Sequence, residues 1–118
     1  MKIDVSDFNR LAVTLAGVGP RTFKAAAMVT EKAARDIERD AKAFAPVDTG
    51  NLRASIGTDI DVSAASISAT VGATASYAAY VEYGTSTMAP RAHLGPAYDR
   101  HVGTWMTALD RLMSGVLG

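Results

Sequence analysis

The apolar residues of this chain change their spacing at the segment Ala45–Ile56, and that change limits the fold more than any other feature. Before the segment they recur at three- and four-residue steps, which is typical of a helix, and after it they alternate with polar residues as in a strand. Pro46 cannot continue the preceding helix. Asp48 and Thr49 can cap the first turn of a new short helix, and Gly50 can adopt backbone angles that side chains forbid. The sequence therefore predicts a helical layer joined to a sheet at this point.

The helix before this joint is predicted over residues 21–44. One face carries small residues in the middle and a phenylalanine at each end: Phe23, Ala27, Thr30, Ala34, Ile37, Ala41 and Phe44. Such a face can lie close against a sheet, because alanines let two backbones approach. The opposite face carries i,i+4 ion pairs, each contributing only ~0.2–0.5 kcal/mol: Glu31 with Arg35, and Glu38 with Lys42. We interpret this charged face as solvated, with a contact to another subunit as the alternative.

After the joint, the sequence predicts a β-hairpin over about residues 55–74. The apolar sides of its two strands are Ile56, Thr58, Ile60 and Val62, then Ile67, Ala69, Val71 and Ala73. Asp59 and Asp61 lie on the other side of the first strand. The connection over 63–65 is short, which favours antiparallel pairing. An isolated hairpin is only marginally stable in water, so we expect a further strand, from this chain or from a neighbouring copy, to complete the sheet.

Helices are also predicted at both ends of the chain. Near the N-terminus, Ser6 can cap a helix from Asp7 to about Ala16, and two glycines and a proline then form a turn. At the C-terminus, Pro96 opens a helix over about 96–116 with the apolar stripe Tyr98, Val102, Trp105, Leu109, Leu112 and Val116. Residues 77–83 are either a short helix or an extended segment, and residues 85–95 form an exposed loop.

Together these elements predict one α+β domain over residues 1–118. In this domain a small antiparallel sheet, built on the hairpin, packs against the long helix and the C-terminal helix. Residues 1–19 are expected to form an N-terminal helix and turn. At 118 residues, 48% of them hydrophobic, the chain can bury a core without metals or disulfides.

Composition excludes several classes of function. The chain has no cysteine, which removes thiolate metal sites and a cysteine nucleophile. Twelve basic and twelve acidic residues cancel, so no global charge attracts nucleic acid or an anionic membrane. Asp4, Asp7 and Arg10 interrupt the N-terminus, unlike the apolar run of a signal peptide, and no window is apolar enough for a membrane span. We expect a soluble intracellular protein.

No residue pattern indicates a catalytic, cofactor-binding or metal site. The two histidines, His93 and His101, lack the paired spacing of a zinc site. Glu82 stands among the tyrosines of residues 77–83. One interpretation is a catalytic acid whose pKa is tuned by the aromatic setting. We favour the other, a buried carboxylate that accepts backbone or tyrosine hydrogen bonds. No serine lies in a Gly-x-Ser-x-Gly turn. We expect neither an enzyme nor a cofactor; the competing hypothesis is a small hydrolase centred on Glu82 or His93.

Two segments of the chain resemble those of a known family. The first is Ala-Pro-Val-Asp-Thr-Gly-Asn-Leu-Arg-Ala-Ser-Ile at 45–56, after a long amphipathic helix. The second is Tyr-Ala-Ala-Tyr-Val-Glu-Tyr-Gly-Thr at 77–85, followed by a loop with a proline and by Leu-Gly-Pro-Ala at 94–97. In this order they resemble the small head–tail joining, or tail-completion, proteins of long-tailed bacteriophages and prophages. The resemblance covers about residues 20–115.

The resemblance implies a structural neck protein with a fold similar to tail terminators. It implies a homo-oligomeric ring, a hexamer that matches the tail tube, with a twelvefold ring as the alternative. The implied partners are the head-closure or connector protein on one side and the tail tube or tail terminator protein on the other. DNA would pass through without specific recognition, and no membrane takes part. The protein would reside in the neck or tail of the virion after assembly in the host cytoplasm. The alternative role is that of the tail terminator itself, which caps the tube.

The resemblance also suggests where the copies of a ring meet. We expect the interface to use residues of the joint, of the tyrosine segment and of the following loop: Asp48, Thr49, Asn51, Arg53, Glu82, Tyr83, Met88, Arg91 and His93. In a ring, one surface contacts a different surface of the next copy, so a neighbour can complete an unpaired sheet edge. For Asp48, Thr49 and Gly50 the alternative is that they only hold the turn.

Overall fold

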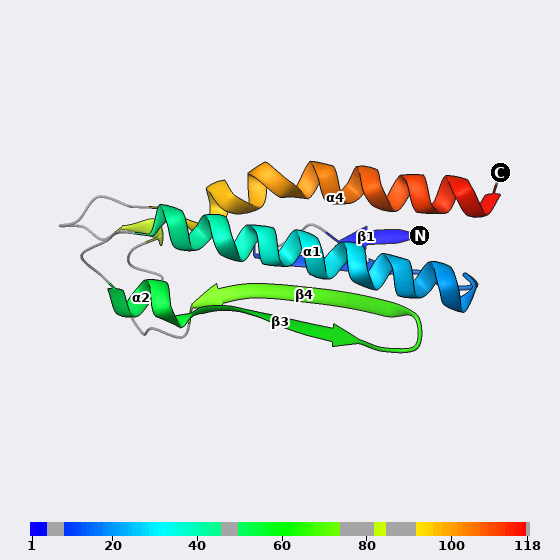
Figure 1. Cartoon of the computed structure of the whole chain (residues 1–118), viewed down its shortest axis with the longest axis horizontal. Coiled ribbons are helices and arrows are strands. Elements are labelled where there is room, and N and C mark those ends of the chain that lie inside the picture. Colours follow the sequence, from blue (N-terminus) through cyan, green and yellow to red (C-terminus); the bar gives the residue numbers. More distant parts are fainter. Residues whose placement is uncertain (5–8, 46–49, 74–81, 85–91, 118) are drawn as a thin grey trace.

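The computed structural model describes residues 1–4, 9–45, 50–73, 82–84 and 92–117. Figure 1 shows an elongated molecule in which a sheet and two long helices run along the same axis. The α+β class predicted from the sequence is confirmed. In chain order the elements are β1 (Lys2–Asp4), β2 (Arg10–Thr14), α1 (Pro20–Phe44), α2 (Gly50–Ser55), β3 (Ile56–Val62), β4 (Ser66–Ala73) and α4 (Leu94–Leu117).

The four strands of the sheet follow the order β1-β2-β4-β3, and every neighbouring pair is antiparallel. β3 and β4 form the predicted hairpin, with Ile60 opposite Ala69. The further strand that the hairpin needs comes from this chain, because β2 pairs with β4 and places Val13 opposite Ile67. The seven-residue β3 and the three-residue β1 are therefore the edges of the sheet.

The N-terminal helix predicted for residues 7–16 is wrong, because residues 10–14 form the strand β2, which pairs with β1 at residues 2–4. Leu11 and Leu15 suit one face of a helix, but Leu11, Val13 and Leu15 also alternate as in a strand, so periodicity does not decide between the two. Pairing with β4 decides it, since all three side chains become buried in the core while the backbone joins the sheet. The predicted turn does follow, at Gly17 with a φ of 79°.

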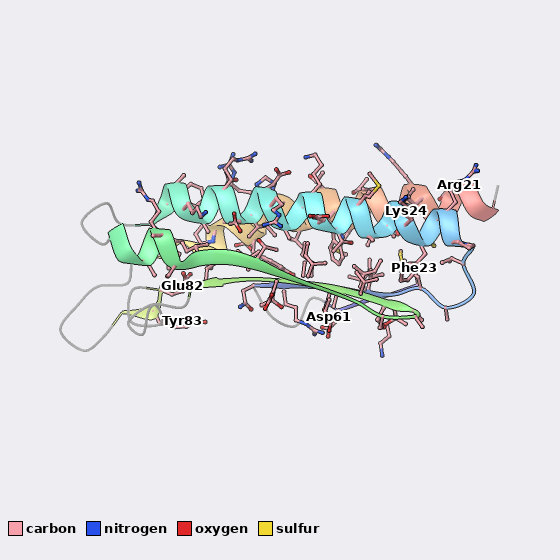
Figure 2. All side chains as sticks on the ribbon, turned by 60° about the horizontal axis from the view of Figure 1, so that its bottom comes forward. Arg21, Phe23, Lys24, Asp61, Glu82 and Tyr83 are labelled. Atoms are coloured by element: carbon pink, nitrogen blue, oxygen red, sulfur yellow. The ribbon has the colours of Figure 1, made fainter. Side chains whose placement is uncertain are left out.

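Both long helices lie on one side of the sheet (Figure 2). α1 packs across β3 and β4, and α4 returns beside α1 in the opposite direction. The predicted bounds of these helices, 21–44 and 96–116, are confirmed to within two residues. Among the described residues, no helix covers the other side of the sheet, which we call the open face.

α1 is buried over a wider arc than the predicted stripe, because it contacts the sheet and α4 at once. Phe44, predicted to anchor one end of the stripe, is 38% exposed, and the Arg100 guanidinium lies 5.7 Å from the centre of its ring. Phe23, the other predicted anchor, is half-buried and points towards the sheet (Figure 2). The buried residues of α1 are Ala26, Thr30, Ala33, Ala34, Ile37, Asp40 and Ala41.

A buried hydrogen-bond chain holds α4 against α1. The indole N–H of Trp105 donates to Thr30 Oγ1 at 2.9 Å, and the Thr30 hydroxyl donates to the carbonyl oxygen of Ala26 at 2.8 Å. Trp105 is only 1% exposed, so its indole N–H needs this internal acceptor. These two hydrogen bonds therefore fix how α4 is aligned along α1.

Candidate functional site

Glu82 caps the N-terminus of α4 from a distant part of the sequence. Its Oε1 accepts hydrogen bonds from the backbone N–H groups of His93 and Leu94, both at 3.0 Å, and its Oε2 accepts one from Gly95 at 3.2 Å. The side chain is buried, and a negative charge at this position suits the dipole of α4. Of the two interpretations that the sequence left open, the structure supports the buried carboxylate that accepts backbone hydrogen bonds.

His93 lies inside the protein beside this cap. It is fully buried, and its Nδ1 is 3.0 Å from Glu82 Oε1 but is not aligned for a hydrogen bond. Leu94 is buried too and already belongs to α4. The exposed loop predicted for residues 85–95 therefore ends earlier than expected, because His93 and Leu94 are buried and their backbone N–H groups bind Glu82. Residues 85–91 of that prediction, including Met88 and Arg91, lie outside the described residues.

The joint between α1 and the sheet is braced by Arg53 of α2. Its Nη2 donates a hydrogen bond to the carbonyl oxygen of Ala45, the residue that follows α1, at 3.3 Å. Leu52 of the same short helix is fully buried and fixes α2 on the core. Asn51 belongs to α2, whereas Asp48 and Thr49 fall outside the described residues. The capping role of Asp48 and Thr49 and the interface role of all three residues therefore stay predictions.

The described parts of the two segments that carry the family resemblance lie at one end of the molecule. Figure 2 places Glu82 and Tyr83 at the end that also holds α2, although about thirty residues separate the two segments. Tyr83 is 65% exposed, whereas its neighbour Glu82 is buried. Of the interface candidates whose side chains are described, Tyr83 is thus on the surface, while Glu82 and His93 act as internal supports.

Asp40 is a buried carboxylate between α1 and α4 that the sequence analysis did not single out. Its oxygens lie 2.5 Å from His101 Nε2, 3.3 Å from Arg100 Nη1 and 3.3 Å from Arg39 Nε. The hydrogen bond with His101 holds the pKa of Asp40 below its usual value, aided by the two arginines and opposed by burial. The position of Asp40 three residues after the stripe residue Ile37, beside the apolar face of the helix, is the sequence signal that points to such a group.

The open face of the sheet is polar and hollowed. Its middle carries small side chains, including Ala12 and Ser68, while charged side chains stand on both edge strands. One hollow of about 310 Å³ is bordered by Lys2, Asp4 and Arg10, and the salt bridge of Asp4 with Arg10 spans 3.6 Å. A second hollow, of about 480 Å³, lies over β3, β4 and β2; its lining includes Arg10, Asp59, Asp61, Ser68 and Thr70.

A family model matches residues 11–84, and its description reads "Bacteriophage HK97-gp10, putative tail-component". The match runs from β2 through the joint and the hairpin to the segment of Glu82 and Tyr83, which is more than half of the chain. The chain belongs to the HK97-gp10-like family. The family predicted from the two sequence segments is thereby confirmed. No curated protein and no solved structure gave a match.

As a member of the HK97-gp10-like family, the protein is a structural component associated with the phage tail, and its place is in the virion. The part of the chain that the structure describes contains no helix both long and apolar enough to cross a membrane. Nor do three His, Asp or Glu side chains gather within that part as ligands of a metal ion would. The surfaces to consider in this HK97-gp10-like protein are therefore the open face, the β3 edge and the end that holds Tyr83.

Proposed function

We propose that this HK97-gp10-like protein forms a closed ring at the neck of the virion, where it joins the head to the tail tube and completes the tail. The main structural support for this proposal is the long edge strand β3 beside the open face. Family membership supplies the setting, since a tail component works as part of a larger assembly. The ring is proposed to be a hexamer, in keeping with a sixfold tail tube.

The edge strand supports assembly because its backbone pairs on one side only. β3 has seven residues, and β4 is its sole neighbour in the sheet of the described chain. Such an edge presents unpaired N–H and C=O groups, which monomeric proteins usually shorten or cover. In a ring built from head-to-tail contacts, each copy covers the β3 edge of the next one, so no copy leaves this edge exposed.

The end that holds Tyr83 is proposed to contact the other neck components. Tyr83 is exposed there, and aromatic residues are enriched in protein interfaces. Asp48, Thr49, Asn51, Met88 and Arg91 belong to the same proposal, with the head-closure protein on one side of the ring and the tube on the other. Arg53, Glu82 and His93 take the role of supports, because their contacts are internal.

A structural role also agrees with the chemistry of Glu82. Its two oxygens accept three backbone hydrogen bonds, so the carboxylate is engaged in holding α4. We propose no catalytic function for this residue or for His93. A hydrolytic activity that disappears in Glu82→Gln, while the fold is retained, would contradict this assignment.

Electron microscopy of assembly products tests the proposed function. In the phage or prophage that encodes this protein, a stop codon at Lys2 should yield filled heads beside free tails of normal length, and a plasmid copy of the gene should restore joined particles. Tails of uncontrolled length would instead assign the role of tail terminator. Intact, infectious virions without the protein would refute a neck function altogether.

A further inference from the structure

Two surfaces of opposite charge lie on opposite sides of the molecule. On the sheet side, Asp59 and Asp61 are exposed on β3 and belong to the open face, because side chains alternate along a strand. On the helix side, Arg21 and Lys24 are exposed at the start of α1. Figure 2 shows Arg21 and Lys24 in the helical layer and Asp61 on the far side of the sheet. The acidic pair and the basic pair therefore face away from each other.

Neither pair has an ionic partner within the described part of the chain. The ion pairs of α1 start at Glu31, which binds Arg35 at 3.7 Å, and leave out the first turns of the helix. On the open face, Arg10 binds Asp4 at 3.6 Å instead of Asp59 or Asp61. Lys2 on β1 is likewise without an ion pair in the described part of the chain, so the open face keeps two acids and one base, and the start of α1 two bases, for an external partner.

The position of the basic pair is unfavourable for an isolated molecule. Arg21 lies in the first turn of α1 and Lys24 in the next, and no acidic residue stands in the first turn. The positive end of the helix dipole is located there, so it repels cations and attracts anions. A negative surface from another molecule would remove this repulsion and neutralise both side chains.

We propose that the open face around Asp59 and Asp61 binds the start of α1 from a neighbouring copy, with Arg21 and Lys24 as the ionic partners. The inference rests on the proposed ring and adds, beside the β3 edge, two surfaces through which each copy contacts the next. The chain as a whole carries no net charge, so no general repulsion opposes contact between copies.

The shapes of the two surfaces support this contact. Met28 is 63% exposed and lies one turn after Lys24, so the basic surface ends in an apolar side chain. On the open face, the small side chains Ser68 and Thr70 form the bottom of the hollow of about 480 Å³, beside Asp59 and Asp61. Long side chains such as those of Arg21, Lys24 and Met28 can enter this hollow, whereas a face with large side chains would exclude them.

The positions of the two surfaces suit a ring. Because they differ from each other and lie on opposite sides, the contact is heterologous and repeats from copy to copy. Figure 1 shows the start of α1 and the β3–β4 turn at the same end of the long axis. Neighbouring copies can therefore stand side by side, with the sheet of one against the helical layer of the next.

Cysteine cross-linking tests the contact directly, since the natural chain has no cysteine. Lys24→Cys protein mixed with Asp61→Cys protein should form a mixed disulfide roughly ten times faster than the matched control, Lys24→Cys mixed with Asp110→Cys. Asp110 is an exposed acid on α4, outside both surfaces. Equal rates for the two mixtures would overturn the proposal.

Charge reversal gives a second test with a readout in sedimentation. Asp61→Lys and Lys24→Glu should each lower self-association at least about tenfold, and the two changes in one chain should restore it, because the charges then match again across the contact. Circular dichroism checks that each variant is folded. Failure of the double variant to restore association would overturn the contact.

The two proposals can fail separately. The protein can form rings, and its absence can abolish the neck, while cross-linking is no faster than in the control. In that case the contact is wrong and the neck function stands. If the mixed disulfide forms rapidly while the Lys2 stop codon leaves virions intact, the contact stands and the neck function is wrong.

Discussion

The contact between α1 and α4 and the open face of the sheet differ in whether their charged side chains have ionic partners. Between α1 and α4, the buried carboxylate of Asp40 is surrounded by Arg39, Arg100 and His101. On the open face, Asp59 and Asp61 have no ionic partner among the described residues, although both are exposed on a regular strand. The contact between α1 and α4 thus has its charges matched within one chain, whereas the open face holds charges that have no ionic partner in the described part of the chain.

This difference separates folding from assembly. Substitutions between the helices should change the free energy of unfolding, because the partners there are internal. Substitutions on the open face should change association between copies and leave the free energy of unfolding nearly as it is.

Trp105→Ala should have the largest effect. It removes the largest fully buried side chain and leaves Thr30 without its donor, so the free energy of unfolding should fall by about 3–5 kcal/mol. Urea denaturation followed by circular dichroism measures this change. Met106→Ala, at the exposed position next in sequence, is the control and should cost less than about 1 kcal/mol. Equal losses in the two variants would contradict the assigned packing of α4.

Glu82→Ala should come next. It removes the acceptor of three backbone hydrogen bonds at the start of α4, and the unsatisfied N–H groups should lower the free energy of unfolding by about 1–3 kcal/mol. Glu82→Gln keeps the shape and one acceptor oxygen, so its stability should fall between those of Glu82→Ala and the natural protein. Thermal denaturation that places all three proteins at the same midpoint would show that the cap contributes nothing.

Asp40→Asn should change the pH dependence of stability. The native pKa of Asp40 is lowered, so its charged form stabilises the fold above the unfolded pKa of about 4, and this contribution is lost as the pH falls through the lower native value. The natural protein should therefore lose stability more steeply in acid than Asp40→Asn. Asp99→Asn, on the exposed side of α4, serves as the control and should keep the natural slope. Parallel acid curves for all three proteins would refute the prediction.

Asp61→Asn should have the smallest effect on stability, within about 0.5 kcal/mol, because the side chain is exposed and has no ionic partner in the described chain. Self-association measured by sedimentation should nevertheless weaken. A large loss of stability would show that Asp61 serves the fold and would remove the contrast between the two regions.

The sequence predicts this fold well where one period dominates. α1 and α4 follow a long helical repeat, and β3 and β4 alternate over seven and eight residues, so their bounds are close to those observed. The N-terminal segment has only a few apolar residues, which suit either period, and its pairing with β4 joins positions more than fifty residues apart. A local pattern carries no information on such a contact, and the predicted helix was wrong for this reason.

The same limit applies to the candidate site. The burial of Glu82 was predictable from its aromatic setting, but its partners, the backbone groups of residues 93–95, follow from the tertiary fold. Asp40 escaped notice because i,i+4 pairing describes one helix, whereas two of its partners stand on α4. Asp59 and Asp61 were placed on the correct side of their strand, but their lack of partners emerges only when the neighbouring strands are known.

A cryo-electron microscopy reconstruction of the neck of the intact virion tests the ring and its contact together. We expect a closed ring of this chain between head and tail tube, in which the open face of each copy, at Asp59 and Asp61, contacts the start of α1 in the next copy. A neck without this chain, or a ring whose open faces are all exposed to solvent, would contradict this expectation.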